Sequence, residues 1–229
     1  MISKIHQHLL SLQDQKYRDF SSKIILQKDY PMIGIRLPEL RKYAKELMKE
    51  NSIPNFQDKY YEEVLLHGLC IGLYKCDFPL KIRLIEDFLP LINDWGICDS
   101  FIPSLKDIRK HLDEYLPYVK KYLKTDMEFY QRFSFVVLLD YYRDIRYLKE
   151  IFRSIRATKY NGYYSRMASA WLLSYMFMFF YDEAKEFVKE NRIDKDVLLK
   201  GIQKAIDSYR VNEKQKDELR KLRSICRQD

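Results

Sequence analysis

The sequence predicts an all-α protein, built as an array of antiparallel helix pairs. Three observations predict it: few strand-forming residues, apolar residues spaced at the helical period, and prolines at regular intervals. The 229-residue chain holds only two threonines, seven valines and six glycines, a composition poor in the residues that build strands and hairpins. Its 47% apolar content is enough for a substantial core without disulfide bonds.

Apolar side chains recur three and four residues apart in three segments, as one face of a helix requires. The segments are 38–50, 128–142 and 212–225. The first begins with a proline, which is favoured in the first helical turn. In the second segment only the last position of the face is polar. The positions are Leu40, Tyr43, Ala44 and Leu47; Phe129, Phe133, Val136, Val137 and Asp140; and Leu219, Leu222 and Ile225.

The prolines suggest a repeat. All seven precede residue 118, and we expect Pro38, Pro79 and Pro117 each to open a helix. Their spacing of about 40 residues is the period of HEAT-type helix pairs. No Gly/Ser-rich linker divides the chain, so we predict a single HEAT-like domain over residues 1–229. Such an α-solenoid curves, and its concave face suits a long, regular ligand.

Positive charge is concentrated in the second half of the chain. Residues 1–115 carry 17 basic and 17 acidic side chains, whereas residues 116–229 carry 24 and 16, and residues 116–170 alone carry 11 and 5. A one-sided basic region is typical of proteins that bind polyanions, and it predicts a concave basic groove. An ordinary basic surface and, less well, a membrane surface are the alternatives.

The cysteines and the apolar runs indicate a cytoplasmic protein that does not bind membranes. Cys70, Cys76, Cys98 and Cys226 show no C-x-x-C spacing, which favours reduced, buried thiols over disulfides or a zinc site. The N-terminal segment is amphipathic and unlike a signal peptide. The longest apolar run, 168–181, is too short to span a bilayer and predicts a core helix.

The familiar cofactor motifs are absent. There is no Gly-rich phosphate loop of either common type, which argues against ATP and NAD as cofactors. The metalloprotease motif H-E-x-x-H and the serine-hydrolase motif G-x-S-x-G are missing too. The four histidines, His6, His8, His67 and His111, are scattered, so we expect no metal and no other cofactor.

The segment LINDWGICDSFIP carries the best chemical site. Asn93 or Asp94 can cap a helix that begins at Trp95 and ends before Pro103. Trp95 and Asp99 then lie one turn apart on the same face. An aromatic wall beside a carboxylate suits a cationic centre. The alternative is structural: Trp95 belongs to the core and Asp99 bonds a neighbouring helix end.

Two further residues are candidates for this site. Arg132 lies in an apolar helix, where a buried cation needs a carboxylate or a bound anion, so that Asp99 or a phosphate is its expected partner. Trp171 lies in a helix that is apolar nearly all round, so a plain core role is the alternative for it.

Six segments in this order resemble the AlkD-like DNA alkylation-repair glycosylases, a family built of HEAT-like repeats. Gly34-Ile35-Arg36 and Pro38-Glu39-Leu40-Arg41 look like its hallmark. The segments are YRDFSSKI, MIGIRLPELRKYAKEL, INDWGICDSF, FYQRFSFVVLL, YYSRMASAWLLSYMF and KAIDSYRVNEKQKDELRKLR.

The resemblance implies that Asp99, Trp95, Trp171 and Arg132 line the groove. It also implies a DNA glycosylase of base excision repair that releases positively charged alkylated purines, such as N3-methyladenine and N7-methylguanine. The family grips the deoxyribose and backbone of the damaged nucleotide without flipping its base into a pocket. An N-terminal aromatic residue that helps some members bind DNA has no clear counterpart here, and Tyr17, Phe20 and Tyr30 stay unassigned.

The chemistry fits that reaction. A cationic base is already a good leaving group, so the main need is a carboxylate that stabilises the oxocarbenium-like sugar and orients water. We assign this role to Asp99, without a metal, and expect the tryptophans to exclude water. Arg132 and nearby cations would hold phosphates of double-stranded DNA that contains alkylated bases. These cations are Lys120, Lys121, Lys124, Arg143, Arg146 and Arg166.

We expect a monomer. The main alternative function is a non-catalytic helical-repeat module that binds damaged or branched nucleic acid, or protein. A protein-interaction scaffold would instead require a large exposed apolar patch.

Overall fold

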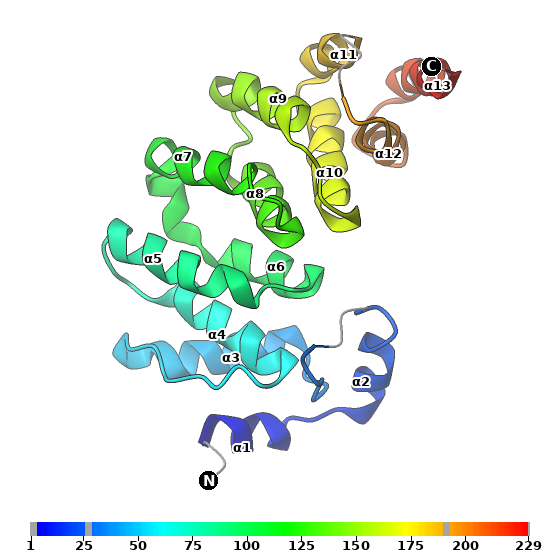
Figure 1. Ribbon diagram of the computed structural model, residues 1–229. Helices are drawn as coiled ribbons and strands as arrows, with labels where there is room; N and C mark the ends of the chain where they lie inside the picture. The colour runs from blue at the N-terminus through cyan, green and yellow to red at the C-terminus, as the bar shows by residue number, and fades with distance from the viewer. Residues whose placement is uncertain (1–3, 26–28, 190–192, 229) are drawn as a thin grey trace. The chain divides into compact units, whose positions relative to one another are not determined.

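The computed structural model describes residues 4–25, 29–189 and 193–228. These residues form 13 α-helices joined by short 3₁₀ segments and loops, and they contain no strand (Figure 1). The predicted all-α class is confirmed, and the succession of helices is compatible with an α-solenoid. The chain divides into two compact units, residues 1–111 and 112–229, so a single domain over 1–229 stays a prediction.

The first unit is assembled around α4, a helix that is buried on nearly every side. Such all-round burial is expected of a helix that is apolar all round. It packs against α1, α3, α5 and α6. The elements of this unit are α1 (Lys4–Ser11), α2 (Gln15–Ser21), α3 (Leu37–Leu47), η1 (Met48–Glu50), α4 (Tyr61–Leu73), α5 (Phe78–Phe88), η2 (Leu89–Leu91), α6 (Trp95–Phe101), η3 (Ile102–Ser104) and η4 (Lys106–Lys110).

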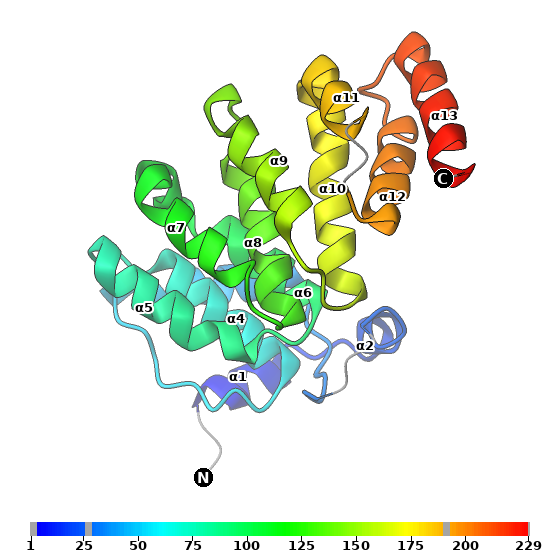
Figure 2. The same cartoon turned by 45° about the horizontal axis from the view of Figure 1, so that its top comes forward.

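The second unit has two layers. The helices α8, α10 and α12 lie side by side in one layer, while α7, α9 and α11 cover them from the other (Figures 1 and 2). The longest helix, α10, is the centre of the unit, and α13 packs on α12. The elements are α7 (Leu112–Tyr122), α8 (Glu128–Tyr141), η5 (Ile145–Tyr147), α9 (Leu148–Ala157), α10 (Tyr163–Phe179), α11 (Tyr181–Lys189), α12 (Lys195–Ile206) and α13 (Glu213–Gln228).

Two of the three prolines open helices as predicted. Pro38 lies in the first turn of α3 and Pro79 in the first turn of α5. The prediction for Pro117 is wrong, because α7 begins at Leu112 and runs through the proline. Pro117 is the sixth residue of α7 and lies inside the helix, where its missing N–H leaves the carbonyl of Asp113 without the usual donor four residues on.

The predicted helical faces are present, with one difference at the C-terminal end. Leu40 and Ala44 of α3 are buried, as are Phe133, Val136 and Val137 of α8. In α13, Leu219 is buried but Ile225 is 60% exposed. No helix in the described ranges is both long and apolar enough to cross a membrane.

Candidate functional site

The helix α6 has the bounds that its sequence predicts. Asp94 caps its N-terminus, since the Oδ1 atom of Asp94 accepts a hydrogen bond of 2.6 Å from the backbone N–H of Gly96. The helix begins at Trp95 and ends at Phe101, before Pro103. Trp95 and Asp99 are therefore one turn apart on one face, and both side chains are half-buried.

Tyr61 of α4 holds the start of α6 through a hydrogen bond. Its hydroxyl donates to Oδ1 of Asp94 at 3.1 Å. Burial, and next the charge of Asp94, raise the pKa of Tyr61, so the phenol stays protonated and remains a donor. Gly96 makes this approach possible, because a Cβ atom there would collide with the Tyr61 hydroxyl. The position of Trp95 thus depends on the buried Tyr61 and on Gly96, the residue that follows Trp95.

A cavity of about 270 Å³ lies beside Trp95, within the first unit. Two aromatic residues of α2 contribute to its wall. Phe20 is 60% exposed, and the guanidinium of Arg36 lies 4.7 Å from the ring centroid of Tyr17. The sequence alone assigns neither residue a role, and α2 is only seven residues long, too short to show a clear helical face. Besides these, Ile25, Ile35, Tyr61, Glu62 and Trp95 line the cavity.

Glu62 holds the loop that precedes α3. Its buried carboxylate accepts hydrogen bonds from the backbone N–H groups of Ile33, Gly34 and Ile35, at 2.8, 2.7 and 3.2 Å. Gly34 has a φ of 96°, and a Cβ atom there would collide with Arg18 and with the carbonyl of Asp14. Residues 33–35, which include Gly34 and Ile35 of the motif, thus form a loop that wraps a buried carboxylate beside the cavity.

Arg132 and Trp171 lie in the second unit, on the neighbouring helices α8 and α10. Arg132 is only 6% exposed, and its Nη1 donates to the carbonyl of Tyr164 at 3.2 Å. Trp171 is half-buried and meets the ring of Tyr175 edge-on, with centroids 6.1 Å apart. Trp171 therefore keeps an accessible surface, as a contact residue requires.

The four predicted site residues thus form two pairs, one in each unit. Trp95 and Asp99 belong to the first, and Arg132 and Trp171 to the second. Their meeting in one groove stays a prediction.

Three of the six predicted DNA-binding cations are held by carboxylates. Their ion pairs are Lys120 with Glu150 at 2.7 Å, Arg146 with Asp144 at 3.0 Å and Arg166 with Asp194 at 3.1 Å. The hydrogen bond from Lys120 lowers the pKa of Glu150, and that from Arg146 lowers the pKa of Asp144.

The other three cations differ in their surroundings. Arg143 lies over the ring of Tyr175, at 5.6 Å from its centroid, and Lys121 lies 5.8 Å from that of Tyr122. Lys124 lines a cavity of about 330 Å³ between the ends of α7 and α9. Within the described ranges Lys124 makes no ion pair.

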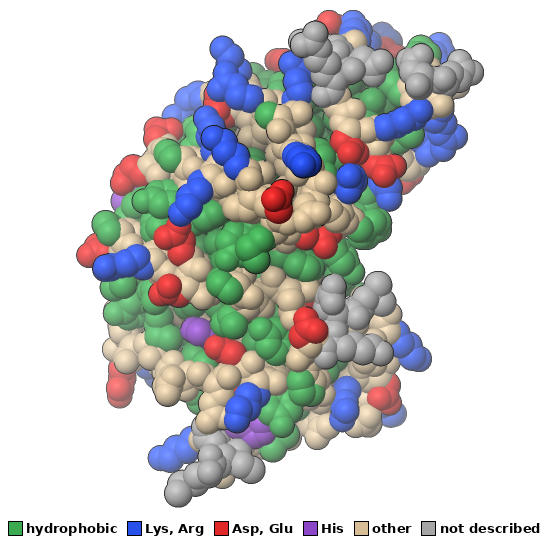
Figure 3. Space-filling view, viewed as in Figure 1, with side chains coloured by type: hydrophobic (Ala, Val, Ile, Leu, Met, Phe, Trp, Pro, Cys, Tyr) green, Lys and Arg blue, Asp and Glu red, His purple; other side chains and the backbone are tan. Residues whose placement is uncertain are grey.

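The charge of the two units differs as the sequence suggests. With the boundary at residue 111, the first unit has 17 basic and 15 acidic residues and the second has 24 and 18. On the face shown in Figure 3, Lys and Arg side chains are more numerous over the helices of the second unit.

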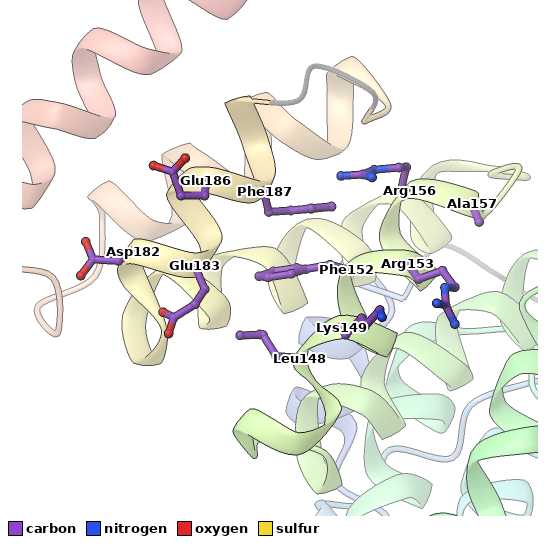
Figure 4. A pocket seen from close by; sticks show the side chains of 10 residues that line it. All are labelled: Leu148, Lys149, Phe152, Arg153, Arg156, Ala157, Asp182, Glu183, Glu186 and Phe187. Carbon is purple, nitrogen blue, oxygen red and sulfur yellow. The ribbon is translucent and has the colours of Figure 1, made fainter.

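A larger cavity, of about 820 Å³, lies between α9 and α11 (Figure 4). Phe152 and Phe187 stack there at 4.2 Å, and Arg156 covers Phe187 at 4.9 Å. Basic residues of α9 form one wall and acidic residues of α11 the other. The cavity contains none of the residues that the sequence singled out.

Potential metal ligands are dispersed. Among the described residues, no three His, Cys, Asp or Glu side chains are grouped so that they could hold a metal ion. The four cysteines, all in the described ranges, are not joined in disulfide bonds, and burial raises the pKa of Cys70 to about 12.

The fold and these residues define a class: an all-helical protein with a basic, aromatic-rich second unit. The model of the DNA alkylation repair enzyme family matches residues 5–200. The chain belongs to this family, which supports an enzymatic role in DNA alkylation repair. No curated protein and no solved structure matches the chain.

Proposed function

We propose that the protein is a DNA glycosylase that excises positively charged alkylated purines, such as N3-methyladenine and N7-methylguanine, from double-stranded DNA. The observation that carries the proposal is the pairing of Trp95 with Asp99 on α6. Both side chains are half-buried on a short capped helix, and Trp95 lines a cavity. The family match over residues 5–200 supports the repair role.

Asp99 stabilises the sugar in the proposed reaction. The glycosidic bond breaks with its electron pair moving to the cationic purine, which leaves as a neutral base, and positive charge develops on the deoxyribose. A carboxylate near C1′ lowers the energy of this oxocarbenium-like state. Asp99 also orients the attacking water and accepts its proton. No general acid is required, because the leaving base is already charged.

The remaining residues bind and exclude water. Trp95 and Trp171 contact the sugar and strengthen the electrostatic effect of Asp99 by displacing solvent. Arg132 holds a backbone phosphate, and its guanidinium is already oriented by the Tyr164 carbonyl. The proposal requires the two units to bring both residue pairs to one groove, in a monomeric protein that uses no metal.

The test is base release from methylated duplex DNA by the wild type and by Asp99→Asn. We expect release of 7-methylguanine to fall by about 10²-fold or more, the range found on removing one preorganised electrostatic contact, while DNA affinity stays within about twofold. The matched control is Asp87→Asn, an exposed aspartate on α5 of the same unit, which should release base at the wild-type rate.

Equal release by wild type and Asp99→Asn would overturn the assignment of Asp99. DNA binding without any release by the wild type would favour the non-catalytic module instead. Activity that survives prolonged chelation by EDTA is expected for a metal-free reaction.

A further inference from the structure

A stripe of aromatic side chains continues along α10 beyond Trp171. Tyr175 and Phe179 follow it at intervals of four residues, which places neighbouring rings on adjoining parts of the helix surface. The ring centroids are 6.1 Å apart between Trp171 and Tyr175, and 5.8 Å apart between Tyr175 and Phe179. Phe179 is 44% exposed, so the stripe ends at the surface.

Two arginines from other elements lie over this stripe. Arg143, just after α8, has its guanidinium carbon 5.6 Å from the Tyr175 centroid, and Arg210, between α12 and α13, lies 5.6 Å from that of Phe179. Arg210 also lies 5.7 Å from the ring of Tyr209, which is 87% exposed. All these residues belong to the second unit.

The two guanidinium groups are available to an anion. Both arginines are exposed, and in the described ranges neither takes part in an ion pair, unlike Arg146 and Arg166. A guanidinium over a ring face loses less freedom when it binds, and its N–H edge fits the two oxygens of a phosphate. Aromatic rings beside such a group can pack against the apolar face of a deoxyribose in the same strand.

We propose that Arg143, Tyr175, Phe179 and Arg210 form a second DNA-contact surface, which binds the sugar–phosphate backbone of the strand leading away from the nucleotide held at Trp171. The occupant follows from charge complementarity and from the continuity of the stripe with Trp171. This inference rests on the proposed function for its starting point at Trp171, but its own measurement is of binding alone.

The test measures affinity for an undamaged duplex by fluorescence anisotropy over a series of salt concentrations. Arg143→Gln and Arg210→Gln should each weaken binding and reduce the slope of log affinity against log salt by about one, and the double variant by about two. The control is Arg220→Gln, an exposed arginine of α13 paired with Asp217, which makes the same charge change and should alter affinity less than twofold.

Two further variants separate orientation from charge. Tyr175→Leu removes the ring under Arg143 and should weaken binding although no charge is lost, whereas a purely electrostatic patch would be unaffected. Arg210→Lys keeps the charge but lacks the planar guanidinium. Its DNA affinity should therefore lie between the affinities of the wild type and of Arg210→Gln. Thermal unfolding checks that each variant is folded, since the two arginines are exposed but Tyr175 is half-buried.

The position of the contact is tested with duplexes that carry one 7-methylguanine and are shortened on one side or the other. DNA affinity is measured in the Asp99→Asn background. The loss of affinity caused by Arg210→Gln should vanish when the duplex is shortened on one side of the 7-methylguanine and persist when it is shortened on the other. Unchanged affinity and salt slope in the double variant would overturn the inference, and 7-methylguanine release by the wild type would show that the proposed function stands regardless.

Discussion

The two units differ in how they use charge. In the first, the notable charged groups are buried carboxylates. Glu62 accepts hydrogen bonds from three backbone N–H groups. Asp94 caps α6 and also accepts a hydrogen bond from the Tyr61 hydroxyl. In the second, the notable groups are exposed or half-buried arginines, which either pair with carboxylates or lie over aromatic rings.

The difference indicates a division of tasks in the proposed reaction. Stabilising a cationic sugar needs a carboxylate at a fixed position, and in the first unit hydrogen bonds of Asp94 with Tyr61 and Gly96 hold the start of α6. Holding a DNA strand needs several cations with weaker positional demands, and the second unit provides them. Substitutions in the first unit should therefore change rates more than salt dependence, and those in the second should do the reverse.

The largest effect is expected at Glu62. Glu62→Gln places an amide NH₂ against backbone N–H donors, and should cost about 3 kcal/mol of unfolding free energy, as lost charge-assisted hydrogen bonds do. Urea denaturation measures this, and Glu46→Gln, exposed on α3, is the control. Because Glu62 lines the cavity beside Trp95, base release should fall more than DNA affinity. An equal fall in both would break the division between the units.

A smaller effect is expected at Lys81, a buried lysine of α5. Its Nζ donates to the carbonyls of Ile71 and Tyr74, at 2.7 and 2.6 Å, and so closes the C-terminal end of α4. Lys81→Met leaves these carbonyls without that donor and should cost about 2 kcal/mol. Lys110→Gln, at an exposed lysine of the same unit, should be neutral.

Lys81 also predicts a pH dependence. Desolvation by burial lowers its pKa below the ordinary value of 10.5, so between the two values the unfolded chain binds more protons than the folded one. Unfolding free energy then rises with pH across that window, and the cost of the buried charge is fully present below it. The difference in unfolding free energy between the wild type and Lys81→Met should therefore grow as pH approaches 10.5. A flat difference would show that Lys81 is not desolvated.

The smallest effect is expected at two lysines of the second unit, Lys124 and Lys120. Lys124→Gln should reduce the salt slope of DNA affinity by about one. Lys120→Gln should reduce it less, because its ammonium already lies 2.7 Å from Glu150. The reverse order would show that Lys120 leaves Glu150 to bind DNA.

The local features of the site were predictable because they are short-range. The cap at Asp94, the start at Trp95 and the end before Pro103 each depend on residues within one or two turns of α6. The helical faces of α3 and α8 follow from periodicity. Pro117 does not mark a helix start because α7 contains it as its sixth residue, so the residue type alone does not fix where a helix begins.

Other features depend on residues far apart in the chain. Nothing in the local sequence indicates that Glu62 would hold residues 33–35, or that Tyr17 and Phe20 would lie beside Trp95. The same is true of Arg143 and Arg210, which are 67 residues apart in number yet both lie over the stripe on α10.

The sequence by itself determined the helical class, the bounds of α6 and the basic bias of the second half, because propensity, capping and composition act locally or as sums. Only the tertiary structure decided which carboxylates are enclosed, which cations are paired and which aromatic rings carry an arginine. Those outcomes depend on contacts between distant segments, whose partners are chosen by the packing of whole helices.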